Sequence, residues 1–154
     1  MNIIKLQQYD INNGDGVRAS IWTAGCNHKC KGCWSSSTWN KEQGTPYNEL
    51  KEEIVKLLSN KNIDGVSILG GDPLLGIMEY NDHDIIDLLK LCKEYNKPVW
   101  LWTGFLIENI PKEVINLCNV IIDGKFEVDK KDRTLKYRGS SNQRVINCNT
   151  FVTK

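Results

Sequence analysis

The sequence predicts an α/β fold with a mainly parallel sheet. Short apolar segments typical of buried strands alternate with segments whose apolar residues recur at helical spacing, and this alternation indicates βαβ units. Each predicted strand is followed by a polar stretch that contains glycine, and the first of these stretches also contains three cysteines. A length of 154 residues fits one domain, which we expect to span residues 1–154.

Four short segments are predicted to be strands. The first alternates apolar and polar side chains, and the other three are short apolar runs. In chain order they are residues 17–22, 66–69, 99–102 and 120–122. Parallel strands end at one edge of a sheet, and ligands of α/β folds bind there. We therefore expect one site to be formed by the stretches that follow the strands, residues 26–33, 70–73, 102–104 and 123–125.

Three further segments are predicted to be helices. Thr45 is expected to be the N-cap of the first helix, with Pro46 as its first helical residue, and apolar residues then recur with helical period as far as Leu58. The second helix is expected over residues 82–95, with Cys92 on its apolar face, and a short third helix over 111–117.

Composition and charge exclude several classes of protein. Twenty basic and 19 acidic residues give a net charge of +1, so no strong field draws the chain to nucleic acid or to anionic lipid. No apolar run approaches the roughly 18 residues of a membrane span. Residues 1–5 lack the basic and then apolar pattern of a secretory signal. We therefore expect a cytoplasmic protein with no nucleic-acid or membrane partner.

Three of the six cysteines, Cys26, Cys30 and Cys33, form a C-x3-C-x2-C motif. In a reducing compartment such a group is typical of metal binding or redox chemistry, because thiolates ligate both iron–sulfur clusters and zinc. Three cysteines on a four-iron cluster leave one iron with an open position, which is the catalytic arrangement. A zinc site completed by His28 or by a distant cysteine, or a chance grouping of cysteines, is the alternative.

The other three cysteines are scattered along the second half of the chain. Cys92 and Cys118 lie on apolar helical faces and are expected to be small core residues, whereas the role of Cys148 stays open. Because no second set of closely spaced cysteines exists, a second cluster is not expected.

The chain resembles the radical S-adenosylmethionine enzymes, in which a C-x3-C-x2-C motif follows the first strand of a parallel α/β fold. Within them it is similar to the activating enzymes of anaerobic (class III) ribonucleoside-triphosphate reductase. The similarity covers nearly the whole chain, and its segments are residues 10–16, 25–34, 37–39, 70–74, 100–104, 120–126 and 138–143. The cysteine motif is specific only to the superfamily, while segments 102–104 and 138–143 narrow the resemblance to the activating enzymes.

The resemblance implies an enzyme with the fold of an abbreviated radical S-adenosylmethionine partial (βα) barrel. Cys26, Cys30 and Cys33 would hold a [4Fe–4S] cluster, whose fourth iron would bind the amino and carboxylate groups of S-adenosylmethionine. One electron from a flavodoxin-type donor would yield methionine and a 5′-deoxyadenosyl radical. That radical would take a hydrogen atom from a glycine of the partner reductase. Activation of another glycyl-radical enzyme, or a non-catalytic zinc or iron–sulfur module, stays open.

Residues of two further segments would contact S-adenosylmethionine or the substrate. Gly70, Gly71 and Asp72 resemble the segment that receives the methionine ammonium, since glycine permits close approach and Asp72 can accept from an ammonium. Asp123 and Lys125 resemble an Asp-x-Lys pair whose ammonium could meet the substrate carboxylate. The alternative for both segments is an ordinary turn at the end of a strand.

The adenine is expected to border Gly32, Cys33 and Trp34. Many superfamily members have an aromatic residue at the position of Gly32, so this chain departs from their pattern. His28 lies inside the cysteine loop, where it could donate a hydrogen bond to a cluster sulfur or have no role.

The segment from residue 125 to 144 contains seven basic and three acidic residues, a local excess of +4. This excess indicates either a solvated surface or a contact with the reductase, for which residues 138–142 are the candidate.

Overall fold

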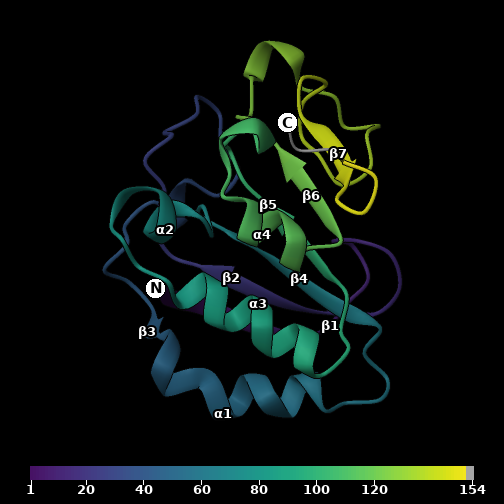
Figure 1. The fold of residues 1–154 in the computed structure, drawn as a ribbon. Helices are drawn as coiled ribbons and strands as arrows, with labels where there is room; N and C mark the ends of the chain where they lie inside the picture. The colour runs from purple at the N-terminus through teal and green to yellow at the C-terminus, as the bar shows by residue number, and fades with distance from the viewer. Residues whose placement is uncertain (152–154) are drawn as a thin grey trace.

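One mixed sheet organises residues 1–151, which the computed structural model describes; residues 152–154 of the predicted domain lie outside them. In this part of the chain the sheet has seven strands in the order β3-β1-β2-β4-β5-β6-β7 (Figure 1). The strands are Asn2–Asp10 (β1), Arg18–Thr23 (β2), Thr45–Pro46 (β3), Gly65–Gly70 (β4), Val99–Trp102 (β5), Val120–Asp123 (β6) and Arg144–Asn147 (β7). The pairs β2–β4, β4–β5 and β5–β6 are parallel, whereas β1–β2, β1–β3 and β6–β7 are antiparallel.

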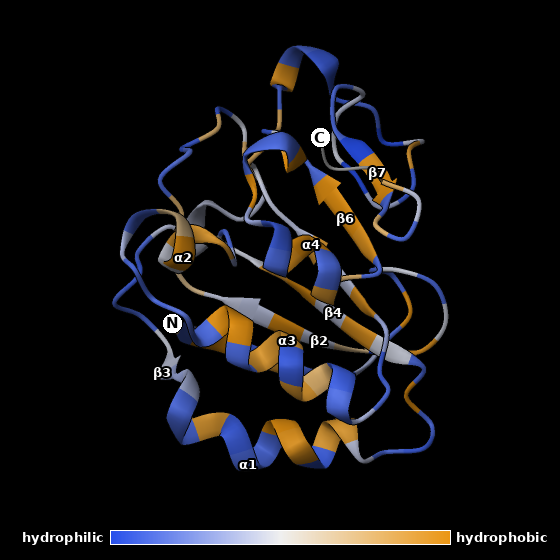
Figure 2. Ribbon diagram, viewed as in Figure 1, coloured by the Kyte–Doolittle hydropathy of each residue, from blue (hydrophilic) through white to orange (hydrophobic). Residues whose placement is uncertain are grey.

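The α-helices of the described chain connect these strands. They are Tyr47–Leu58 (α1), Leu75–Glu79 (α2), Asp84–Glu94 (α3) and Lys112–Leu117 (α4), and short 3-10 turns lie at Ser36–Thr38 (η1), Ile107–Asn109 (η2) and Val128–Lys130 (η3). In Figure 1, α1 and α3 lie on the same side of the sheet. Figure 2 shows orange apolar segments alternating with blue polar ones along both helices. Each helix therefore buries one face only.

Alternation along the central strands sends neighbouring residues to opposite faces of the sheet. One row across the parallel strands belongs to the core beneath the helices and consists of Ile21, Ile68, Leu101 and Ile121, each at most 1% exposed. The next row lies on the other face and lines a pocket; it consists of Trp22, Leu69, Trp102 and Ile122. The parity of a residue along its strand therefore decides whether it serves the core or the pocket.

The predicted central strands and the three predicted helices are confirmed within one or two residues. One predicted boundary is wrong. The first helix begins at Tyr47 with Pro46 at its N-cap, because Thr45 pairs with Ile3 in β3 and the Tyr47 N–H donates to the Met1 carbonyl at 2.9 Å. The chain thus enters the helix directly from a strand.

The outer strands β1 and β7 and the short helix α2 were not predicted. Most of β1 and β7 is exposed or only half-buried, so their side chains carry no clear apolar alternation. The fold class is therefore α/β with a parallel centre and antiparallel edges.

The cysteines of the second half of the chain lie in or against the core, as predicted for two of them. Cys92 and Cys118 are buried, and burial raises the pKa of the Cys92 thiol to about 12. Cys148 is half-buried against the same core. Among residues 1–151, every helix is too short or too polar to cross a bilayer.

Candidate functional site

The polar stretches that follow the central strands meet in one cavity of about 330 Å³ at the carboxyl edge of the parallel strands. Its wall includes Cys26 from the cysteine loop, Gly71 after β4, Thr103 after β5 and Lys125 after β6. The predicted convergence of these stretches is thereby confirmed. The segment between β6 and β7 contributes further wall residues, including Arg138.

The thiols of Cys26, Cys30 and Cys33 all line this cavity and are half-buried. Burial is the largest influence on the pKa of Cys26, which it raises to about 11, and it also raises the pKa of Cys30. Among the described residues, no three His, Cys, Asp or Glu side chains stand as a ready site for a single metal ion. In a four-iron cluster each cysteine instead ligates a different iron.

Backbone N–H groups act on the sulfur atoms of the three cysteines. The Ser35 N–H donates to Cys33 Sγ at 3.4 Å. Backbone hydrogen bonds from His28 and Lys29 stabilise the thiolate of Cys26, and one from Phe126 stabilises that of Cys30. Hydrogen bonds to sulfur are a usual feature of iron–sulfur sites. The three thiols and the N–H groups that donate to them therefore fit a four-iron cluster held by three thiolates.

The turn after β4 packs tightly against the start of the cysteine loop. Gly70 has φ +117°, and a Cβ on it would lie 2.5 Å from the Thr23 backbone. A Cβ on Gly71 would lie 2.4 Å from the Gly25 carbonyl oxygen. Both positions therefore need glycine, and the turn exposes backbone to the cavity beside the thiols.

The carboxylate of Asp72 completes this turn and is only 2% exposed as a residue. It accepts hydrogen bonds from the Thr103 hydroxyl at 2.9 and 3.0 Å and from the Gly104 N–H at 2.9 Å. His28 Nε2 lies 2.6 Å from its Oδ2 atom. One buried side chain thus joins the cysteine loop, the glycine turn and the end of β5.

The structure separates the two residues of the Asp-x-Lys pair. Lys125 lines the cavity, whereas Asp123 is fully buried outside it. Asp123 accepts from the Arg144 guanidinium at 2.9 Å and from the Ile107 N–H at 2.8 Å. Arg144 also pairs with Glu108, and its hydrogen bonds, first to Asp123 and then to Glu108, raise its pKa. Asp123 therefore anchors β6 to β7 and to η2.

Two of the three residues expected near the adenine line the cavity. Cys33 and Trp34 do so, and Trp34 is 68% exposed with the Lys131 ammonium 4.8 Å from its ring centroid. Gly32 lies outside this lining with φ +76°, and a Cβ on it would meet Val128 at 3.2 Å. Gly32 thus lets the cysteine loop pack against the segment that follows β6.

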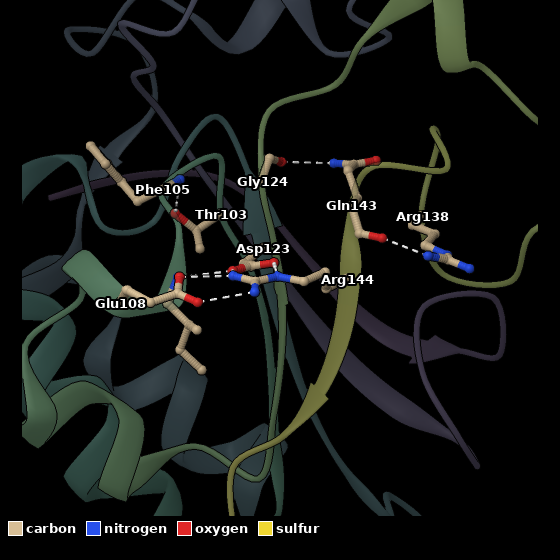
Figure 3. A network of polar contacts seen from close by, with 9 residues as sticks. Thr103, Phe105, Glu108, Asp123, Gly124, Arg138, Gln143 and Arg144 are labelled. Carbon is tan, nitrogen blue, oxygen red and sulfur yellow. Dashed lines mark hydrogen bonds and ion pairs between the residues drawn. The ribbon is translucent and has the colours of Figure 1, made fainter. Parts of the chain in front are cut away.

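Arg138, Gly139 and Gln143 line the cavity, and the segment 138–143 is held by its own polar contacts. Arg138 donates to the Gln143 carbonyl at 2.6 Å, and Gln143 Nε2 donates to the Gly124 carbonyl at 3.0 Å (Figure 3). Gln143 Oε1 accepts from the Gly139 N–H at 2.9 Å. The segment singled out from the sequence is therefore an ordered rim of the pocket.

Sequence reasoning missed Trp22 as a wall residue and Thr103 and Gly104 as partners of Asp72. The Trp22 indole N–H is buried and has no acceptor among the described residues, so a bound ligand could supply one. The available signal was parity, because Trp22 follows Ile21 and must face away from the core.

The protein has an α/β fold, with three cysteine thiols beside a glycine turn at the carboxyl edge of its parallel strands. These features define the class of α/β proteins whose cysteines are ligands of an iron–sulfur cluster. The family model described as a 4Fe-4S single cluster domain matches residues 12–146, which is most of the chain.

Curated relatives carry the name anaerobic ribonucleoside-triphosphate reductase-activating protein. The one from Escherichia coli (strain K12) is 36% identical over 94% of this chain and 97% of its own length. The one from Enterobacteria phage T4 is 39% identical over 94% and 93%, and that from Salmonella typhi 38% identical over 88% and 92%. The chain belongs to this family of activating proteins, as the sequence resemblance predicted.

Proposed function

We propose that this chain is an activating enzyme that installs a glycyl radical on anaerobic ribonucleoside-triphosphate reductase, using a [4Fe–4S] cluster and S-adenosylmethionine. One observation carries the proposal, namely that three free thiols and a glycine turn line the same cavity. The activating function in the names of the relatives supports the choice of partner. The parallel core of β2, β4, β5 and β6 suits the partial (βα) barrel expected for such an enzyme.

The cysteine loop would hold the cluster through Cys26, Cys30 and Cys33. When bound, the cluster would supply one electron for cleavage of S-adenosylmethionine into methionine and a 5′-deoxyadenosyl group, which takes a hydrogen atom from a glycine of the reductase. The backbone N–H groups around the sulfurs stabilise negative charge on them.

The turn at Gly70 and Gly71 would receive the methionine ammonium through backbone carbonyls that glycine leaves accessible. Asp72, whose oxygens already accept from protein donors, would hold the turn in place. Lys125 would provide the positive charge for a carboxylate. Asp123 would anchor β6 to β7 and to η2, outside the ligand site.

The aromatic wall would accommodate the adenosyl part. Trp34 and Cys33 line the cavity, and Trp22 contributes an indole N–H that has no acceptor within residues 1–151. Because Gly32 packs on Val128, its part would be to position the loop.

Two macromolecular partners belong to the proposal. The target glycine lies in the reductase, so the rim at residues 138–142 and the basic segment around it would contact that protein. A flavodoxin-type protein would donate the electron.

The deciding experiment is anaerobic reconstitution with iron and sulfide, followed by reduction, addition of S-adenosylmethionine and assay of 5′-deoxyadenosine. Wild-type protein is expected to form it. Cys26→Ala is expected to abolish its formation, whereas Cys92→Ala, a matched change in the core, retains it. Addition of the reductase should then produce a glycyl radical signal in electron paramagnetic resonance.

Two results would contradict the proposal in different ways. A colourless protein with one bound zinc and no cleavage would indicate a metal-stabilised binding module. Cleavage without a radical on the reductase, but with one on another glycyl-radical enzyme, would identify the alternative activase.

A further inference from the structure

His28 occupies the middle of the cysteine loop, between Cys26 and Cys30, yet its side chain is only 9% exposed. Its Nε2 atom lies 2.6 Å from Asp72 Oδ2. Its ring meets the Phe105 ring edge-on, with centroids 4.5 Å apart. The side chain therefore ties its loop to the turns that follow β4 and β5.

The backbone that follows β5 leaves space for the His28 ring. Gly104 is not among the residues with positive φ, so its backbone does not by itself require glycine. A Cβ at Gly104 would nevertheless lie 2.5 Å from His28 Cδ2 and 2.7 Å from Nε2. Gly104 is thus needed for space, because the ring rests directly against its backbone.

The Asp72 carboxylate uses its acceptor capacity within the protein. Besides His28, it accepts from the Thr103 hydroxyl, the Gly104 N–H and, at 3.0 Å, the Leu74 N–H. A carboxylate offers about four acceptor sites, so little remains for the ammonium of a ligand. The Asp72 N–H also donates to the Gly25 carbonyl at 2.7 Å. Asp72 therefore fastens the cysteine loop at its start and, through His28, at its middle.

We infer that His28 and Asp72 are positioning residues, which hold the cysteine loop in fixed register with the Gly70–Gly71 turn. This inference rests on the proposed function, in which the thiolates hold the cluster and the turn holds the methionine end of S-adenosylmethionine. His28 acts through Asp72 and is not a ligand of the metal. A loop without this link keeps its three thiols but presents the cluster poorly to a ligand on the turn.

The first test uses the protein without cluster or ligand and measures hydrogen exchange of backbone amides. In His28→Ala, amides of residues 26–30 are expected to exchange about tenfold faster, which corresponds to a loss of about 1.4 kcal/mol of local stability. Amides of β2 and β4 are expected to keep their wild-type rates. The matched control is His83→Ala, since His83 is the other histidine of the chain and is exposed.

The second test uses reconstituted protein and measures iron content and the Kd for S-adenosylmethionine. His28→Ala is expected to bind the wild-type amount of iron but to raise the Kd about tenfold, because one link of about 1.4 kcal/mol is lost. In His28→Gln the side-chain amide can donate to Asp72, so its Kd should return to within about threefold of wild type, a difference below about 1 kcal/mol.

Two results would overturn the inference. One is wild-type exchange and a wild-type Kd in His28→Ala, and the other is loss of iron from that variant with unchanged exchange of the loop, which would make His28 a ligand. If the wild-type protein itself binds no S-adenosylmethionine, the proposed function fails, while the exchange experiment still decides whether His28 positions the loop.

Discussion

Two buried aspartates lie at the carboxyl ends of parallel strands in this protein, and they have different roles. Asp72, in the turn after β4, lines the cavity and accepts from His28 and from the end of β5. Asp123, the last residue of β6, lies outside the cavity and is paired with Arg144. Both are at most 2% exposed, so burial alone does not distinguish a site residue from a structural one.

The difference follows from parity along the strand. Asp123 is two residues beyond Ile121, which belongs to the core, so its side chain projects from the helix-covered face. Asp72 lies beyond the end of β4, where the turn at Gly70 and Gly71 frees the chain from strand alternation. A strand end therefore marks the neighbourhood of a site, and the face on which each residue projects decides whether it takes part.

The largest effect is expected from Asp72→Ala. The change leaves His28, the Thr103 hydroxyl and the Gly104 N–H without their acceptor. Each buried group left without a partner lowers stability by about 1–3 kcal/mol. We expect the free energy of unfolding, measured by urea denaturation, to fall by about 3 kcal/mol. Formation of 5′-deoxyadenosine should fall by at least about 100-fold, since about 2.7 kcal/mol of positioning suffices for that loss. If Asp72→Ala cleaves S-adenosylmethionine at a rate within about threefold of wild type, Asp72 has only a structural role, as Asp123 does.

An intermediate effect is expected from Asp123→Ala. The Ile107 N–H loses its acceptor, but Arg144 keeps Glu108 and is 43% exposed, so water can reach it. The free energy of unfolding, measured by urea denaturation, should therefore fall by about 2 kcal/mol. This loss is smaller than the one expected when a fully buried ion pair is broken. The Kd for S-adenosylmethionine should stay within about threefold, a difference below about 1 kcal/mol. A tenfold rise in Kd with wild-type stability would instead place Asp123 in the ligand site.

The smallest effect is expected from Glu108, the exposed partner of Arg144. The hydrogen bond from Arg144 is the largest cause that lowers the pKa of Glu108 from its ordinary value of 4.5. Its contribution to stability is therefore present above the unfolded pKa and is lost as the pH falls through the lower, folded pKa. The difference in urea midpoint between wild type and Glu108→Gln should be small near neutral pH and shrink in acid. A difference that grows in acid would contradict this assignment.

Much of the fold was predictable from local patterns. The central strands and the helices α1, α3 and α4 are encoded by apolar period, and the outer strands are not, because β1 and β7 bury too little to need a clear pattern. The order of strands and glycine-containing stretches was enough to predict that the cysteine loop and the Gly70–Gly71 turn share one site.

The sequence by itself determined the cysteine loop, the glycine turn and the family, because spacing and residue type along the chain carry that information. Only the tertiary structure decided that Asp123 pairs with Arg144 and that His28 pairs with Asp72. Those partners lie 21 and 44 residues apart in the chain. No local pattern encodes which side chains meet when strands are assembled into a sheet, since that depends on the register and facing of several elements together.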